Sequence, residues 1–481
     1  MKIKTLLFTG LTGLALAGAA QAQTTYIEIT GATAFRSAAV TAINSAFNAG
    51  GNFAYAFANT SAAGNTTSLT NGSMQAWKGT FPGIAGTTII RTSWNGSVEG
   101  VRAVAVPNAT NNPLYLLESN IPGTLAAGGG TPATRRFHSD PGGPGAAVNA
   151  TFYEQVESDM SFSDVAQSAT PVSGLALTGG PVGVVVFSMI ASKTWKDDSA
   201  GDTSGLTNIT AQQFRSMAQL GSVPLSFFSG TSVHTNRVYL TGRNDGSGTR
   251  TSYLAETGVG AAKPIVQYVA HDRSSTTNIP IILKTAAGGA FNFQDVATPQ
   301  YASTVWGLDQ DGNGGHVSSG DVRDDLSKNT TSTAVWEFVD TDESGTYEAG
   351  EDSQVTAAAK LYMISWVTYN DARSARGTGL ASAATAQVLG YEGVILSGLA
   401  GDSPPSNISA ADRALVANGR YTAWNFQQLY YVASRAGAAA VFSELETRLD
   451  NASLIGSAGM PIGEMLVNRT VDGGVILPGA P

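Results

Sequence analysis

The sequence predicts an α/β fold, and three observations lead to this class. Apolar runs with the composition of buried strands recur along the chain, most clearly in residues 181–189 (PVGVVVFSM). Several of these runs are followed by a turn of small residues and then by apolar residues at helical spacing. The 481 residues contain no cysteine, so that packed layers and not disulfides must hold the fold. Alternating strands, turns and helices favour an α/β architecture with largely parallel sheets.

Two strand–turn–helix units lie in the first hundred residues. Residues 26–29 alternate between the two faces of a predicted strand, and apolar residues spaced three or four apart in 35–47 predict an amphipathic helix that begins near Thr33. Residues 87–91 predict a second strand, and a helix begins at Ser97 after an Asn-Gly turn.

The middle of the chain continues the pattern. Residues 181–189 are a buried strand, and 209–217 have helical spacing. A strand at 237–240 precedes a glycine-rich loop at 242–248, which leads into a helix at 249–256.

The remaining segments are less regular. Residues 107–150 are rich in Asn, Pro and Gly and predict a surface excursion. Residues 360–369 fit a strand or a helix, whereas 422–432 and 438–449 are predicted as helices.

The N-terminus has the pattern of a signal peptide. A short positive start precedes an apolar stretch at 5–20, and Ala20-Gln21-Ala22 matches a cleavage site. We therefore expect a periplasmic or secreted protein cleaved near Ala22, with 1–22 removed. The apolar stretch is shorter than the ~20 residues that span a bilayer, and we predict no stable membrane insertion. The net charge of −9 argues against nucleic acid as a partner.

Three of the predicted turns share one chemistry. Each has a glycine after a strand and a Ser or Thr where a helix begins, namely Gly31-Ala32-Thr33, Asn95-Gly96-Ser97 and Asp245-Gly246-Ser247-Gly248-Thr249. The N-terminus of a helix presents unpaired N–H groups and the positive end of its dipole, which suit an anion. The same pattern also fits an ordinary capped helix, and each turn alone leaves both interpretations open.

The third turn carries a further cation. Arg243 comes four residues before Ser247, and a guanidinium matches the oxygens of phosphate in a bidentate manner. The alternative is a surface arginine paired with Asp245. Arg250 follows the turn, and we expect it to point away from the ligand.

Residues 243–249 (RNDGSGT) are similar to the R-x-D-G-S-G-T motif of the phosphate-binding proteins of the high-affinity phosphate ABC importer. Other segments resemble motifs of this family in the same order. These segments are 31–33, 96–101, 161–165, 366–372 and 393–396. The resemblance is spread over most of residues 27–430, with long insertions between the matches.

The resemblance implies a two-lobed, periplasmic-binding-protein-like fold of type II with the ligand in the interlobe cleft. Lobe 1 would hold 23–188 and 400–481, and lobe 2 would hold 189–399. The implied function is that of an exported substrate-binding protein, not an enzyme. It would capture inorganic phosphate or a similar oxyanion and deliver it to an ABC-transporter permease.

The resemblance also implies roles for individual residues. The implied phosphate ligands are Thr33, Ala34, Phe35, Ser97, Arg243, Ser247, Gly248 and Thr249. Asp164 would accept the proton of bound phosphate and so discriminate against sulfate, unless it is a solvated helix-cap residue.

The chain departs from the family pattern in two of these segments. After Thr33 the family has Phe-Pro, and this chain has Ala34-Phe35-Arg36, which leaves open which amide meets the ligand. Glu99 replaces a glycine of the second motif and is expected to face solvent.

An acidic insertion at about 329–356 separates two of the family segments. Within it, Asp340 to Glu351 have oxygen side chains at positions 1, 3, 5, 9 and 12 and glycine at 6, the spacing of an EF-hand calcium loop. The candidate ligands are Asp340, Asp342, Ser344, Thr346 (through its carbonyl), Glu348 and Glu351. Calcium binding and a solvated acidic loop fit equally, and no cofactor is required by the resemblance. Residues 309–314 begin a similar pattern, whereas the resemblance places 314–322 in a loop that lines the ligand cleft.

Two other function classes remain open. One is a cell-surface or extracellular structural protein that uses the same fold and is stabilised by calcium. The other is an exported hydrolase, which the sequence disfavours. The four histidines lie far apart without zinc-ligand spacing, and there is neither a G-x-S-x-G nucleophile elbow nor a G-x-x-x-x-G-K-[ST] loop.

Overall fold

The structure is a computed structural model. It describes residues 24–58, 68–122, 133–137, 152–271, 281–284, 293–294, 300–301, 314–316, 319–327, 335–339, 353–357, 360, 362–376, 385–401 and 404–481. The predicted signal peptide and the segment 340–351 lie outside these residues.

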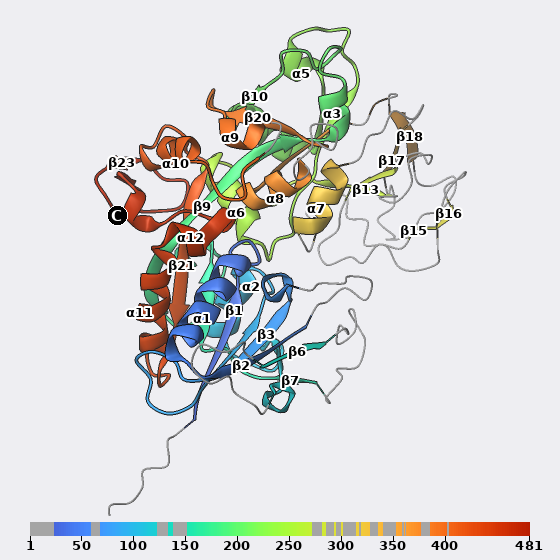
Figure 1. Cartoon of the computed structure of the whole chain (residues 1–481). Helices are drawn as coiled ribbons and strands as arrows, with labels where there is room; N and C mark the ends of the chain where they lie inside the picture. Colours follow the sequence, from blue (N-terminus) through green and yellow to red (C-terminus); the bar gives the residue numbers. More distant parts are fainter. Residues whose placement is uncertain are drawn as a thin grey trace, which may run out of the picture.

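A mixed sheet of 13 strands runs through the described part of the chain. Its strands are β1 (Thr25–Gly31), β2 (Phe53–Ala58), β3 (Met74–Gly79), β4 (Thr88–Ser93), β6 (Ala133–Phe137), β8 (Met160–Ser163), β9 (Thr178–Ala191), β10 (Asn208–Ile209), β11 (Ser222–Pro224), β12 (Arg237–Leu240), β19 (Tyr362–Thr368), β20 (Gln387–Tyr391) and β21 (Trp424–Tyr431). Helices lie against the strands of this sheet along its length (Figure 1), so the α/β class is confirmed.

The prediction of largely parallel sheets is wrong, because parallel and antiparallel pairs are mixed. β1 pairs in parallel with β4 and β8, and β12 pairs in parallel with β19. The long strand β9 runs antiparallel to β19, β20 and β21. Direction depends on which distant strand becomes a neighbour, and a local run of apolar residues does not encode that neighbour.

Strand β9 joins two groups of strands. Residues 178–186 pair with β21, which continues to β8 and β1, whereas 187–191 pair with β19, which continues to β12. Figure 1 shows β9 running from the group around α1 and α2 to the group around α3 and α5. One large apolar core packs along β9 and includes both Ile27 of the first group and Trp366 of the second. The lobe boundaries at 188 and 400 stay a prediction.

Strand β21 corrects the helix predicted at 422–432. Trp424–Tyr431 form a strand between β8 and β9, and every residue except Tyr431 is buried. Residues 424–427 alternate between apolar and polar, but the pairing register with β9 shifts between Gln427 and Gln428 and breaks this alternation in the second half of the strand. The apolar residues at 426, 429 and 430 then fall at helical spacing.

The helices are α1 (Arg36–Gly50), α2 (Ser97–Ala105), α3 (Lys193–Asp197), α4 (Ala211–Leu220), α5 (Ser226–Ser229), α6 (Gly248–Glu256), α7 (Ser319–Leu326), α8 (Tyr369–Ala375), α9 (Ser397–Ala400), α10 (Ala410–Ala417), α11 (Ala438–Leu449) and α12 (Ala452–Ile455). Five of these helices, α1, α2, α4, α6 and α11, coincide with helices predicted from the sequence, and the others were not predicted. Helix α1 begins at Arg36 and not near Thr33. No helix in the described ranges combines the length and apolar character needed to cross a membrane.

Smaller sheets complete the description. β5 (Leu114–Leu116) pairs with β7 (Tyr153–Gln155), and β22 (Val467–Asn468) pairs with β23 (Leu477–Pro478). A separate sheet holds β13 (Tyr268–His271), β14 (Ile281–Lys284), β17 (Val335–Val339) and β18 (Ser353–Ala357). β15 (Phe293–Gln294) pairs with β16 (Gln300–Tyr301).

Candidate functional site

The first two glycine turns lie side by side. Their strands β1 and β4 are parallel neighbours, so the carboxyl ends of both strands meet at one edge. The Gly96 amide donates to the Gly31 carbonyl at 3.0 Å, and the Thr30 hydroxyl donates to Asn95 Oδ1 at 2.8 Å. A methyl group on Gly100, in the first turn of α2, would lie 2.5 Å from the Gly31 Cα. The first turn of α2 is therefore packed directly against the backbone at the end of β1.

The third turn reaches the second from the other group of strands. A methyl group on Gly96 would lie 2.8 Å from the Gly246 carbonyl oxygen, and Gly96 has a φ of 109°. A methyl group on Gly248 would lie 1.7 Å from Asp164 Oδ1 and 2.5 Å from Ser97 Oγ. Only glycine permits this approach. The starts of α2 and α6 therefore converge on one carboxylate.

Asp164 lies at the end of β8 and is 1% exposed, which contradicts the alternative of a solvated helix cap. The Ser97 hydroxyl donates to Oδ1, and the Thr249 hydroxyl donates to Oδ2 at 3.4 Å. Burial raises the pKa of Asp164, and the bonds from Ser97 and Thr249 act in the opposite direction. The backbone carbonyl of Asp164 accepts from the Asn425 side chain at 3.3 Å. The carboxylate therefore lies in a dry, hydroxyl-lined position.

Arg243 is buried, which contradicts the alternative of a surface arginine paired with Asp245. Its side chain is 3% exposed, whereas Asp245 is exposed. Nε donates to the His316 carbonyl at 3.2 Å, and Nη1 donates to Ser319 Oγ at 2.6 Å. Burial lowers the pKa of Arg243, and the carboxylates of Asp371, Asp164 and Asp321 act in the opposite direction.

Ser247 and Thr249 are both buried at the start of α6. Arg250, which follows them, was expected to point away from the ligand, and this stays a prediction. Arg250 is 3% exposed, and its Nη1 donates to the Gly314 carbonyl at 3.0 Å. Arg250 therefore fastens the segment 314–316 onto the third turn.

In the first turn, the backbone is better placed than the side chains to contact a ligand. Phe35 is completely buried, and its ring centroid is 6.0 Å from that of Phe162, so its side chain belongs to the core. Thr33 and Ala34 are half-buried in the turn before α1. Arg36 begins the helix. Burial lowers its pKa, and the Asp371 carboxylate acts in the opposite direction.

Glu99 lies at the rim of the converging turns. It forms an ion pair with Arg102 at 2.8 Å, and its side chain is 38% exposed, in keeping with the expected solvent-facing position. A methyl group on Gly246 would lie 3.2 Å from Glu99 Oε1. Because Arg102 offsets the charge of Glu99, the carboxylate does not leave an uncompensated negative charge beside the turns.

The structure brings Ser97, Asp164, Gly248 and Thr249 into direct contact. Sequence reasoning assigned no role to Asn425, which lies in the segment predicted as a helix. The resemblance placed residues 314–322, which include His316, in a loop that lines the ligand cleft, and this stays a prediction. In the structure Gly314, His316 and Ser319 bond to Arg243 or Arg250.

The candidate calcium loop cannot be placed, because 340–351 and 309–313 lie outside the described residues. The flanking elements β17 and β18 are antiparallel strands, in contrast to the helices of an EF-hand. Within the described ranges, no group of three or more His, Asp or Glu side chains is arranged to hold a metal ion.

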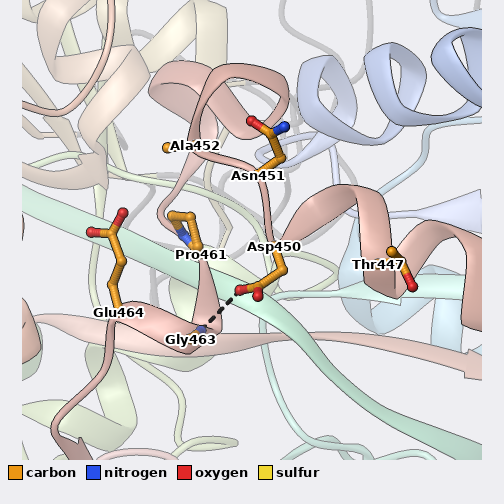
Figure 2. A pocket seen from close by; sticks show the side chains of 7 residues that line it. All are labelled: Thr447, Asp450, Asn451, Ala452, Pro461, Gly463 and Glu464. Carbon is orange, nitrogen blue, oxygen red and sulfur yellow. Dashed lines mark hydrogen bonds between the residues drawn. The ribbon is translucent and has the colours of Figure 1, made fainter.

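A separate hollow of about 600 Å³ lies between α11, α12 and residues 461–464 (Figure 2). Asp450 Oδ1 accepts from the Gly463 amide there at 2.9 Å, and Glu464 forms an ion pair with Arg413 at 2.9 Å. Both carboxylates are already bonded within the protein. This hollow is not part of the candidate site.

Comparisons with known proteins give only distant likeness. No family model matches the chain, and no curated protein matches it. A Clostridium perfringens protein, described as a phosphate ABC transporter substrate-binding protein and solved with bound phosphate, is 9% identical with a TM-score of 0.36, over 89% of this chain and 94% of that one. PstS from Borrelia burgdorferi is 9% identical with a TM-score of 0.32, over 89% and 94%. Superpositions this distant assign no ligand to the chain.

Proposed function

We propose that the chain is an exported substrate-binding protein that captures inorganic phosphate for ABC-type uptake. The observation that carries the proposal is the convergence of the starts of α2 and α6 on Asp164, beside the first glycine turn at the end of β1 and with Arg243 buried in the same loop as the third turn. Two of these turns begin helices of 9 residues each, α2 and α6, whose first N–H groups suit an oxyanion.

The donors and the charges of the site fit a protonated tetrahedral anion. Ser247 supplies a hydroxyl donor, and Arg243 supplies a guanidinium. The hydroxyls of Ser97 and Thr249 donate to Asp164 in the ligand-free protein and would turn to the ligand when it binds, because each has a single hydrogen. When Asp164 is ionised, it repels an anion without a proton and accepts a hydrogen bond from one that carries a proton. Phosphate carries such a proton near neutral pH and sulfate does not, so this carboxylate would select phosphate.

Export and delivery complete the proposal. Residues 1–22 would direct the chain across the membrane, and the partner would be the permease of an ABC transporter. N-terminal sequencing of the protein recovered from the periplasm or medium should begin at Gln23. Recovery of the uncleaved chain from the cytoplasm would contradict this part of the proposal.

The ligand is tested by titrating purified, extensively dialysed protein with phosphate and with sulfate in a calorimeter. We expect phosphate to bind in the micromolar range or tighter, about 8 kcal/mol or more. Sulfate should bind far more weakly. No detectable heat at millimolar phosphate would refute the proposed function, and equal affinities would remove Asp164 from the site.

A further inference from the structure

The loop that carries Arg243 is interlocked with a segment more than 70 residues later in the sequence. The His316 amide donates to the Gly242 carbonyl at 2.8 Å, and the Asn244 amide donates to the His316 carbonyl at 3.0 Å. These two bonds form a parallel bridge that places Arg243 beside His316. A methyl group on Gly315 would lie 2.5 Å from the Arg243 carbonyl oxygen, so the two backbones approach as closely as glycine allows.

The guanidinium of Arg243 is held from two directions by this segment. Nε donates to the backbone carbonyl of His316, and Nη1 donates to the hydroxyl of Ser319, the first residue of α7. Arginine carries five N–H groups in one rigid plane. Fixing two of them therefore fixes the direction in which the others point.

A buried side-chain pair connects the two segments that bind the guanidinium, namely the bridge at His316 and helix α7. His316 Nε2 lies 2.7 Å from Asp325 Oδ2, and the residues are 6% and 1% exposed. Asp325 lies on α7, the helix that begins at Ser319. The ring of His316 therefore connects the carbonyl that holds Nε to the helix that holds Nη1.

The energetics favour a positioning role for this pair over a merely stabilising one. Removing a charged or polar pair from water is costly, and apolar side chains of similar volume often stabilise a core as well or better. What an apolar pair cannot do is set the register of α7 against the bridge at His316 by a directed hydrogen bond.

We propose that His316 and Asp325 are positioning residues for the oxyanion site, which act by aiming the guanidinium of Arg243 into it. This inference rests on the proposed function, because it assumes that Arg243 contacts the ligand. It adds two residues, neither of which touches the ligand itself.

The first test uses the ligand-free protein and needs no phosphate. His316→Leu removes the bond to Asp325, whereas His316→Gln retains a donor at the ε position. Hydrogen–deuterium exchange of the peptide that covers 242–250 should accelerate about tenfold or more in His316→Leu and remain near the wild-type rate in His316→Gln. The matched control is His234→Leu, because His234 contacts Ser229 and Asp202, away from this loop. Unchanged exchange in His316→Leu would overturn the proposal.

The second test asks whether His316 acts through Arg243. His316→Leu should weaken phosphate binding about tenfold in the wild-type background. In an Arg243→Lys background it should change affinity less than about twofold, because a lysine cannot make both bonds of the guanidinium. Full additivity of the two changes would show that His316 acts independently and would overturn the positioning role. If wild-type protein binds no phosphate, the proposed function fails, and the exchange experiment still decides whether the pair orders the Arg243 loop.

Discussion

Adding one methyl group at Gly248 should disrupt both the fold around Asp164 and the binding of phosphate. In Gly248→Ala the new carbon would lie 1.7 Å from Asp164 Oδ1 and 2.6 Å from Ser97 Cβ. An ordinary contact begins at 3.4 Å, so the start of α6 and Asp164 must separate by roughly 1.7 Å. Alanine within a helix would by itself stabilise by about 0.5–1 kcal/mol over glycine. Overpacking costs about 1–3 kcal/mol and should dominate.

The assay combines a thermal melt with phosphate calorimetry. We expect a lower melting temperature and at least a hundredfold loss of affinity, roughly the 2.7 kcal/mol that misplacing two hydrogen-bond donors would cost. The matched control is Gly180→Ala, because a methyl group at Gly180 meets nothing within 4 Å. A Gly248→Ala protein that melts at or above the wild-type temperature and binds phosphate normally would refute the convergence of α6 on Asp164.

Three further predictions address the selectivity of the site, a buried charge pair and the acidic insertion. Asp164→Asn should raise sulfate affinity relative to phosphate in paired titrations, since the carboxylate that repels an unprotonated anion is gone; an unchanged ratio would argue against its role. Burial raises the pKa of Glu28, which is bonded to Arg91 at 2.6 Å, to about 7, against about 4.3 in an unfolded chain. Its stabilising contribution is therefore complete below about pH 4 and is lost as pH rises through 7, by about 4 kcal/mol in all. Urea unfolding at pH 5 and pH 8 should show this difference in the wild type and a smaller one in Glu28→Gln, and equal differences would refute it. Calcium that binds only the folded protein should stabilise it by mass action, by about 2.7 kcal/mol at a hundredfold excess over the dissociation constant, and should therefore raise the melting temperature. Glu351→Gln should abolish this shift and leave phosphate binding unchanged. A melting curve that EDTA leaves unchanged would mean that the loop is merely acidic, and loss of phosphate binding in EDTA would place the insertion in the site.

Elements with strong local signals could be predicted from the sequence. β12 and α2 begin where the turn residues and the periodicity place them. β21 was missed as a strand, because its alternation of apolar and polar residues holds only for 424–427 and is broken where the register with β9 shifts after Gln427. The direction of the strand pairs was also missed, since β9 finds its partners across more than 170 residues.

In the candidate site, too, the features with a local sequence signal could be predicted, and those that depend on long-range contacts could not. Each glycine turn is a local signal, and once β1 and β4 are parallel neighbours, two of the turns lie at the same edge of the sheet. The contacts of His316 and Asn425 are long-range, because His316 meets a loop 73 residues earlier and Asn425 reaches Asp164 through the pairing of β21 with β8. No spacing in the sequence marks either residue.

The central claim is that the converging turns and Arg243 bind phosphate. The most direct measurement is calorimetric titration of the purified, phosphate-free protein, carried out on the wild type and on Arg243→Ala. Our account predicts a single site of micromolar affinity or tighter in the wild type, and a loss of about 2 kcal/mol or more in the variant. Wild-type protein that shows no binding at millimolar phosphate, or a variant that binds as tightly as the wild type, would contradict it.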